Sequence, residues 1–112
     1  MLTSHRVFEE PRPGFFRHSA SSLIIHKDED LRCAGQYTLD EMFKAATATA
    51  DSIKQYPTEL DSTHCAFNTR HGVPMFQYYA ERPTYAARFA KAMTGVAKLD
   101  RQIGELRDFF PW

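Results

Sequence analysis

The residues best suited to metal binding or nucleophilic chemistry are His64, Cys65 and His71. Zinc prefers thiolate and imidazole ligands, but its structural sites use paired Cys or His at regular short spacing, and that pattern is missing here. A Cys65 nucleophile would need a histidine base and an acid that orients it, and adjacency in sequence does not provide that geometry. We therefore predict no metal site and no catalytic residue, and we interpret these side chains as polar loop residues.

Adjacent carboxylates occur in Glu9-Glu10 and in Asp28-Glu29-Asp30. Such groups can perform acid-base chemistry or hold a cation, but charge runs of this kind usually face solvent, and we interpret both runs in that way. His18 lies between a predicted strand and a predicted helix. It is either a hydrogen-bonded residue of that junction or a functional imidazole, and the sequence leaves both interpretations open.

The glycines exclude a nucleotide-binding loop. All five are isolated in the sequence, whereas phosphate-binding and dinucleotide-binding loops need several glycines at close, fixed spacing. We therefore predict no cofactor-binding residue in this chain.

Composition limits the partners that the chain can have. Its 112 residues suit one domain and include 14 basic and 14 acidic side chains, so the basic footprint of a nucleic-acid-binding protein is missing. Apolar residues make up 43% and aromatics 13%, which is too apolar for a disordered tail. No run is long and apolar enough to span a bilayer and no signal peptide is recognisable, so we expect a cytoplasmic protein with neither nucleic-acid nor membrane partners.

Residues 1–26 are predicted to form a β wing and a short helix. Two apolar pairs, Val7-Phe8 and Phe15-Phe16, flank a segment with two prolines and a glycine, which favours a turn. The hydroxyls of Ser19 to Ser22 then favour a helix start.

Residues 38–56 are predicted to form an amphipathic helix. Thr38 and Glu41 have the spacing of a capping box, and Pro57 prevents continuation. Helical spacing gives one apolar stripe, formed by Leu39, Met42, Phe43, Ala46, Ala50 and Ile53. Residues 57–73 are predicted to form a long polar loop.

Residues 74–107 are predicted to form two further helices, and residues 108–112 a linker. Pro74 suits a first helical position, Pro83 ends the first helix, and Thr84 can cap the second. The second helix has an apolar stripe of Phe89, Met93, Val96, Leu99, Ile103 and Leu106. The expected fold is mainly α, a short β wing followed by about four helices in a single unit spanning 1–112.

The order of these segments resembles a known family. Residues 7–22 look like the wing and following helix start in the N-terminal winged-helix, dimerisation region of plant- and fungal-type small-molecule O-methyltransferases, which use S-adenosylmethionine. Downstream segments resemble, in the same order, those that lead toward the catalytic domain of that family: 66–68, 74–76, 85–93 and 108–112.

The resemblance implies a remnant of that dimerisation domain. The leading dimerisation helices, the helix-turn-helix core and the domain with the S-adenosylmethionine loop and catalytic His base are expected to be missing, so we expect a truncated chain that is inactive alone. By resemblance, the residues that bind the acceptor are Phe67, Met75, Phe76, Phe89 and Met93. Aromatic and thioether side chains at such spacing equally suit core packing, and both interpretations stay open.

Three functions remain. The first is a truncated O-methyltransferase of fungal secondary metabolism, which would act on a small aromatic acceptor when complemented, as a homodimer or a heterodimer with a methyltransferase. The second is an interaction module that docks on an intact biosynthetic enzyme through its apolar faces. The third, a winged-helix nucleic-acid binder, is disfavoured by the zero net charge and by the lack of a recognition helix before the wing.

Overall fold

The computed structural model describes residues 1–99, 103–109 and 111. It begins with an antiparallel hairpin of β1 (Phe8–Arg12) and β2 (Phe15–His18), in which Phe8 pairs with His18 and Arg12 with Phe15. Gly14 turns the hairpin with a φ of 81°, a conformation that glycine adopts without a steric penalty. The predicted mainly α fold with a short β wing is confirmed.

Helices make up most of the described chain after the wing. In order they are α1 (Ala20–Lys27), α2 (Glu29–Tyr37), the π-helical turn η1 (Thr38–Met42), α3 (Phe43–Ala46), α4 (Thr49–Gln55), α5 (Ala66–His71), α6 (Met75–Ala80), α7 (Pro83–Leu99) and α8 (Ile103–Phe109). In the described part there are more of them than the four expected, because the predicted helix over 38–56 is interrupted and the helices α2 and α5 were missed.

Local capping explains several boundaries. The Ser19 hydroxyl accepts a hydrogen bond from the Ser22 amide and begins α1, as its position predicted. The helix α2 was missed. Asp28, assigned to a solvent-facing charge run, accepts hydrogen bonds from the amides of Asp30 and Leu31 and is the N-cap of α2. Pro83 is the first residue of α7, where its missing N–H costs nothing, so Thr84 is not the cap.

The predicted capping box at Thr38 is wrong. Thr38 has helical dihedral angles and continues α2 into η1, whereas an N-cap residue is extended. The predicted helix over 38–56 is also interrupted at Thr47 and Ala48, between α3 and α4. Most of its apolar stripe faces solvent, since Leu39 is 72%, Phe43 64% and Ile53 62% exposed, whereas Met42 packs against a buried cluster. The buried side of this segment is formed by Glu41, Ala45, Ala48 and Ser52.

The predicted loop over 57–73 contains a helix. The helix α5 begins at Ala66, and Gly72 ends it in the left-handed conformation that suits a helix C-terminus. The long predicted helix corresponds to α7 and α8, and residues 100–102 between them lie outside the described part. The predicted linker also falls partly on residues 110 and 112, which are not described.

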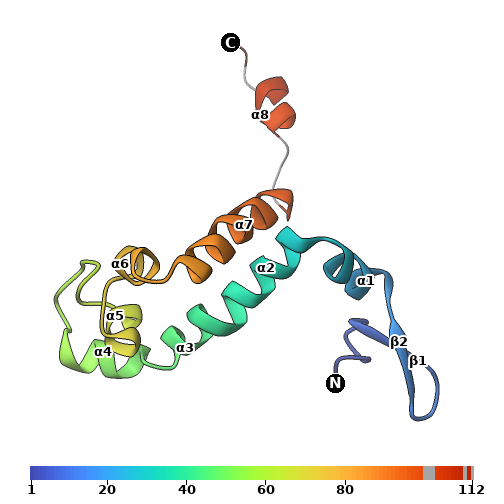
Figure 1. Cartoon of the computed structure of the whole chain (residues 1–112), viewed down its shortest axis with the longest axis horizontal. Coiled ribbons are helices and arrows are strands. Elements are labelled where there is room, and N and C mark those ends of the chain that lie inside the picture. Colours follow the sequence, from blue (N-terminus) through green and yellow to red (C-terminus); the bar gives the residue numbers. More distant parts are fainter. Residues whose placement is uncertain (100–102, 110, 112) are drawn as a thin grey trace.

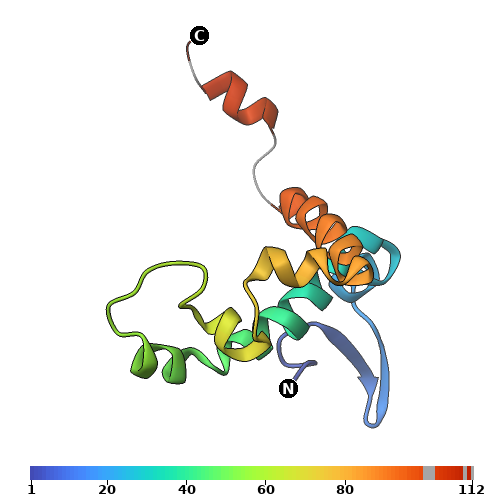
Figure 2. The same cartoon turned by 60° about the vertical axis from the view of Figure 1, so that its left-hand side comes forward.

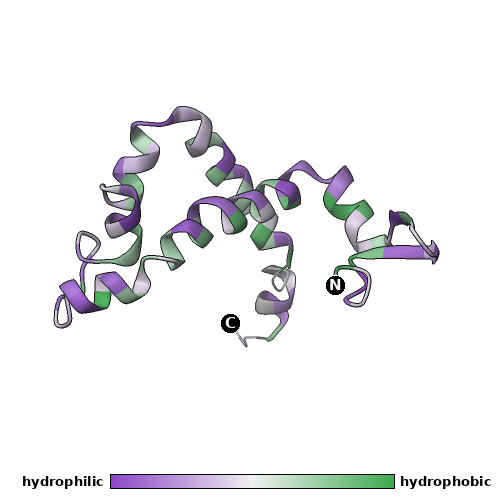
Figure 3. Cartoon of the chain, turned by 90° about the horizontal axis from the view of Figure 1, so that it is seen from below, coloured by the Kyte–Doolittle hydropathy of each residue, from purple (hydrophilic) through white to green (hydrophobic). Residues whose placement is uncertain are grey.

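The arrangement is open. The helices α2 and α7 lie side by side and antiparallel, with the wing near one end and α4, α5 and α6 near the other (Figure 1). The helix α8 stands apart from them (Figure 2). The radius of gyration is 18.5 Å, whereas a compact chain of this length has about 13 Å. Apolar residues occur on several helices (Figure 3), and Leu39, Phe43 and Ile53 among them are exposed, which indicates surface that the described chain does not cover itself.

Candidate functional site

An aromatic cluster joins α5, α6 and α7. Its buried members are Phe67, Tyr78 and Tyr79, packed with Ala45. The Phe67 and Tyr78 rings meet edge-on at 5.5 Å between centroids, and Phe89 stacks on Tyr79 at 4.7 Å. Such ring pairs contribute about 0.5–1.5 kcal/mol each beyond the area they bury. This cluster is the main packed body of the described chain.

The residues assigned to acceptor binding do not all come together. Phe67 lies inside the cluster with 6% of its surface exposed, and Met75 and Phe89 pack against the cluster from its edge. Phe76 is 73% exposed and Met93 is 40% exposed. The cluster thus brings three of the five together, while Phe76 and Met93 lie at the surface.

An ion pair at the edge of this cluster was not anticipated from the sequence. The Arg88 Nη2 on α7 lies 2.8 Å from Oε2 of Glu41 and 2.7 Å from Oδ2 of Asp40, both on η1. Glu41 is 1% exposed, and its Oε2 accepts no well-aligned N–H, so its attraction to Arg88 is mainly Coulombic. Glu41 and Arg88 lie far apart along the chain, and no spacing rule connects the two residues.

Other buried polar atoms lie in the same region. Among the described residues, Oε1 of Glu41, the hydroxyl of Tyr79 and Nε of Arg88 are buried without a hydrogen-bond partner. Burial, and then the charge of Glu41, raise the pKa of the Tyr79 hydroxyl well above its usual range. The same two causes raise the pKa of Tyr37. Native proteins rarely leave such groups unpaired, so this region is a candidate for a specific role.

The side chains first considered for chemistry each have a different hydrogen-bond partner. His64 Nδ1 lies 2.8 Å from Oδ2 of Asp61, and Cys65 Sγ donates to the Ser62 carbonyl. The Thr63 hydroxyl, and then His64, hold the pKa of Asp61 well below its usual range. Asp61 is an orienting acid that the sequence did not reveal, but Cys65 is not bonded to the imidazole that Asp61 orients. His71 belongs to the aromatic cluster, where Nε2 donates to the Glu41 carbonyl at 3.1 Å.

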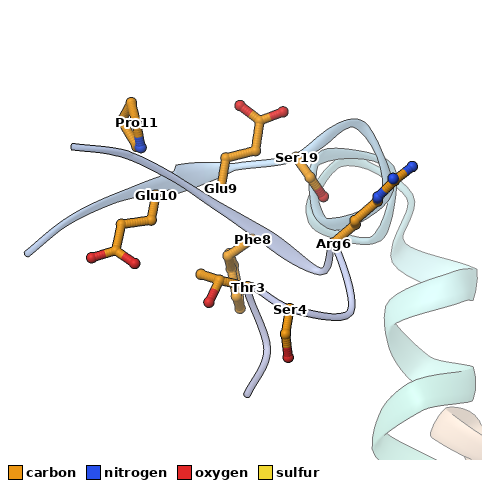
Figure 4. Close-up of a pocket in the computed structure, with 8 residues that line it drawn as sticks. All are labelled: Thr3, Ser4, Arg6, Phe8, Glu9, Glu10, Pro11 and Ser19. Atoms are coloured by element: carbon orange, nitrogen blue, oxygen red, sulfur yellow. The ribbon is translucent and has the colours of Figure 1, made fainter. Parts of the chain in front are cut away.

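His18 has a structural environment at the junction of the wing and α1. Its Nδ1 lies 3.0 Å from the Ser22 hydroxyl, and its ring stacks on His26 at 5.3 Å. An open pocket of about 660 Å³ lies nearby, between the N-terminal segment and the wing (Figure 4). It is lined by Thr3, Ser4, Arg6, Phe8, Glu9, Glu10, Pro11 and Ser19.

An apolar groove lies between α1, α2 and α7. Its volume is about 500 Å³. Its apolar lining is formed by Ile24, Ile25, Leu31, Ala34, Leu39, Val96 and Leu99. The groove was not predicted, because α2 was not recognised in the sequence and three residues of α2 line it.

None of the described helices has both the length and the apolar composition that crossing a membrane requires. Within the same described part, no three His, Cys, Asp or Glu side chains gather as a metal site would require. No protein-family model matches the chain, and no solved structure matches it.

Curated fungal proteins do match. The chain is 62% identical over 112 residues to an O-methyltransferase of Alternaria solani, covering 100% of this chain and 25% of that protein. It is 34% identical over 94 residues to a chlorophenol O-methyltransferase of Trichoderma longibrachiatum, covering 80% of this chain and 20% of that protein. A 3-O-methyltransferase of Phanerochaete chrysosporium is 28% identical over 99% of this chain. The chain thus spans about a quarter of the length of these relatives, and it belongs to the family of fungal O-methyltransferases.

Proposed function

We propose that this chain forms the acceptor-side helices of an O-methyltransferase that transfers a methyl group from S-adenosylmethionine to a small aromatic hydroxyl. The relationship to fungal O-methyltransferases along its whole length supports this role most strongly. A phenolic acceptor is suggested by the chlorophenol O-methyltransferase among the relatives. We place this activity in the cytoplasm and in fungal secondary metabolism.

The five residues assigned to acceptor binding would have two different roles, contact with the acceptor and support of the contacting residues. Phe76 and Met93 are exposed and therefore available to an apolar ligand, and Phe89 of the cluster precedes Met93 by about one turn of α7. Phe67 is buried and would support this surface from behind. We propose that Met75 does the same, since it packs against the cluster. This division is consistent with pockets whose lining is mainly apolar and rigidly backed.

These 112 residues hold no glycine-rich loop for the cofactor, so methyl transfer would require the additional polypeptide that the longer relatives contain. We expect the 112-residue chain to show no heat of binding on titration with S-adenosylmethionine and no methyl transfer. Saturable binding in that titration would contradict the division of roles proposed here.

A second candidate is a docking module for an intact methyltransferase or for a second copy of the chain. The observation that favours it is the exposed apolar stripe of Leu39, Phe43, Ala46, Ala50 and Ile53. Exposed apolar surface of this kind is typical of interaction sites. Size exclusion with light scattering would distinguish a dimer from a monomer, and co-purification with a full-length relative would reveal docking. A monomer that captures no relative would exclude the module.

A further inference from the structure

Glu41 is the largest fully buried side chain of the described chain, an unusual position for a carboxylate. A buried ion pair is weak evidence for stability, because apolar replacements of similar volume are often as stable or more so. Burial of Glu41 therefore needs an explanation other than stability. The best-attested alternative is that a buried ion pair fixes the relative position of the two elements that it joins.

Among the residues that the structure describes, Arg88 is the one cation within ion-pair distance of Glu41. Arg88 also contacts Asp40, but Asp40 has a second cation in Lys44. Asp40 can therefore keep a partner when Arg88 is removed, whereas Glu41 cannot. Arg88 thus joins α7 to η1 through both carboxylates, and of the two it is the buried Glu41 that loses its counter-charge when Arg88 is removed.

The backbone around Glu41 is also fixed in a particular form. Glu41 lies in the π-helical turn η1, and such turns are rare and occur frequently at functional sites. His71 on α5 donates to the Glu41 carbonyl at 3.1 Å. The residue is thus held by α5 through its backbone and by α7 through its side chain.

Phe89 follows Arg88 directly on α7 and is held by two tyrosines near Glu41. Its ring lies 5.3 Å from that of Tyr37, edge-on, and 4.7 Å from that of Tyr79, stacked. The charge of Glu41 acts on both tyrosines, since after burial it is the next cause that raises the pKa of each hydroxyl. Both tyrosines that contact Phe89 are thus subject to the field of the Glu41 carboxylate.

We infer that Glu41 is a positioning residue of the acceptor site, which through Arg88 fixes the place of Phe89 against Tyr37 and Tyr79. The acceptor part of this inference rests on the proposed function, while the geometric part does not. Glu41 itself is not proposed to contact the acceptor. Its role is to fix the position of α7 relative to η1, and that position determines where the Phe89 ring lies.

The test replaces the ion pair by apolar groups in the 112-residue chain, as Glu41→Leu with Arg88→Met. A purely structural pair would leave the Phe89 environment unchanged once the fold is retained. We expect a cooperative melt, loss of the nuclear Overhauser contacts between the Phe89 and Tyr79 rings, and affinity for 4-chlorophenol lowered about tenfold. The matched control is Glu29→Leu with Lys91→Met, an exposed pair at 2.6 Å that joins α2 to the same helix α7 and should change neither readout.

A folded double variant that keeps the Phe89–Tyr79 contacts would overturn the inference. If the double variant does not fold, Glu41→Gln decides instead, because it keeps the shape and removes the charge, and unchanged ring contacts there would be equally decisive. If the unaltered chain does not bind 4-chlorophenol, the proposed acceptor role fails. The ring contacts still decide whether Glu41 positions Phe89.

Discussion

Gly95 on α7 approaches the backbone of Asp30 on α2 so closely that it has no room for a side chain. A β-carbon at Gly95 would overlap the Asp30 carbonyl oxygen and lie 2.6 Å from the carbonyl carbon. The contact involves backbone atoms, which cannot swing aside as a side chain would. The close packing of α2 on α7 therefore requires glycine at this position.

Gly95→Ala is expected to lower the free energy of unfolding by about 1–3 kcal/mol, because the two helices must move apart. Urea denaturation followed by circular dichroism measures the change. Gly35→Ala in α2 is the matched control. A β-carbon there meets nothing within 4 Å, and alanine is the better helix former by about 1 kcal/mol, so this variant should be unchanged or stabilised. Equal effects of the two variants would contradict the packing of α2 on α7.

Arg88→Ala is expected to lower the free energy of unfolding by about 3–5 kcal/mol, because it leaves the Glu41 carboxylate buried without a counter-charge. Thermal or urea denaturation checks this. The control is Lys91→Ala, about one turn after Arg88 on α7. It removes an exposed partner of Glu29 and should leave the midpoint of the unfolding transition nearly unchanged. An Arg88→Ala variant that melts like the unaltered chain would show that Glu41 is not buried as described.

Acid should weaken the contact between α2 and α7. Hydrogen bonding to Lys98, and then to the Leu31 amide, lowers the pKa of Asp28 from its ordinary 3.8. A carboxyl whose pKa is lower in the folded state stabilises the fold above about pH 3.8, and this contribution is lost as the pH falls through the lower folded value. Asn can still cap a helix, so Asp28→Asn should flatten the acid limb of a stability–pH curve while keeping α2. An unchanged acid limb would mean that the Asp28–Lys98 contact does not form in solution.

The two phenylalanines assigned to the acceptor site should behave oppositely. Phe67→Ala is expected to cost about 3–5 kcal/mol, because the side chain is 6% exposed inside the aromatic cluster. Phe76→Ala should leave the melt unchanged, because the ring is 73% exposed, while weakening the binding of a phenol. Nuclear magnetic resonance titration with 4-chlorophenol measures the second effect. A Phe76→Ala variant with undiminished phenol binding would remove Phe76 from the site.

Local signals predicted much of the fold. The wing and α1 follow from the prolines, Gly14 and the Ser19 cap, all of which act within a few residues. The helix α2 was missed because Asp28 was grouped with a solvent-facing charge run, although an aspartate before a helical stretch is also a capping signal. The predicted capping box at Thr38 was wrong because the chain continues from α2 into η1 at Thr38 without the extended residue that an N-cap requires.

Tertiary contacts determined the rest, and no local pattern contains them. Helical spacing placed Leu39, Phe43 and Ile53 on one apolar stripe, but all three side chains are exposed. The opposite face packs because Ala45 contacts Phe67 and because Glu41 pairs with Arg88. Among the assigned acceptor residues, Phe67 is buried and Phe76 is exposed. The sequence could not predict this difference, because burial depends on contacts between segments distant in sequence.

The most direct test of the proposed function is a chimera. The 112-residue chain replaces the aligned quarter of the Alternaria solani O-methyltransferase, and transfer of labelled methyl from S-adenosylmethionine to that enzyme's own acceptor is measured. We expect the chimera to transfer methyl, and Met93→Ala within it to raise KM with the fold retained. A folded chimera that binds S-adenosylmethionine but transfers no methyl would contradict the assignment of this chain to the acceptor side.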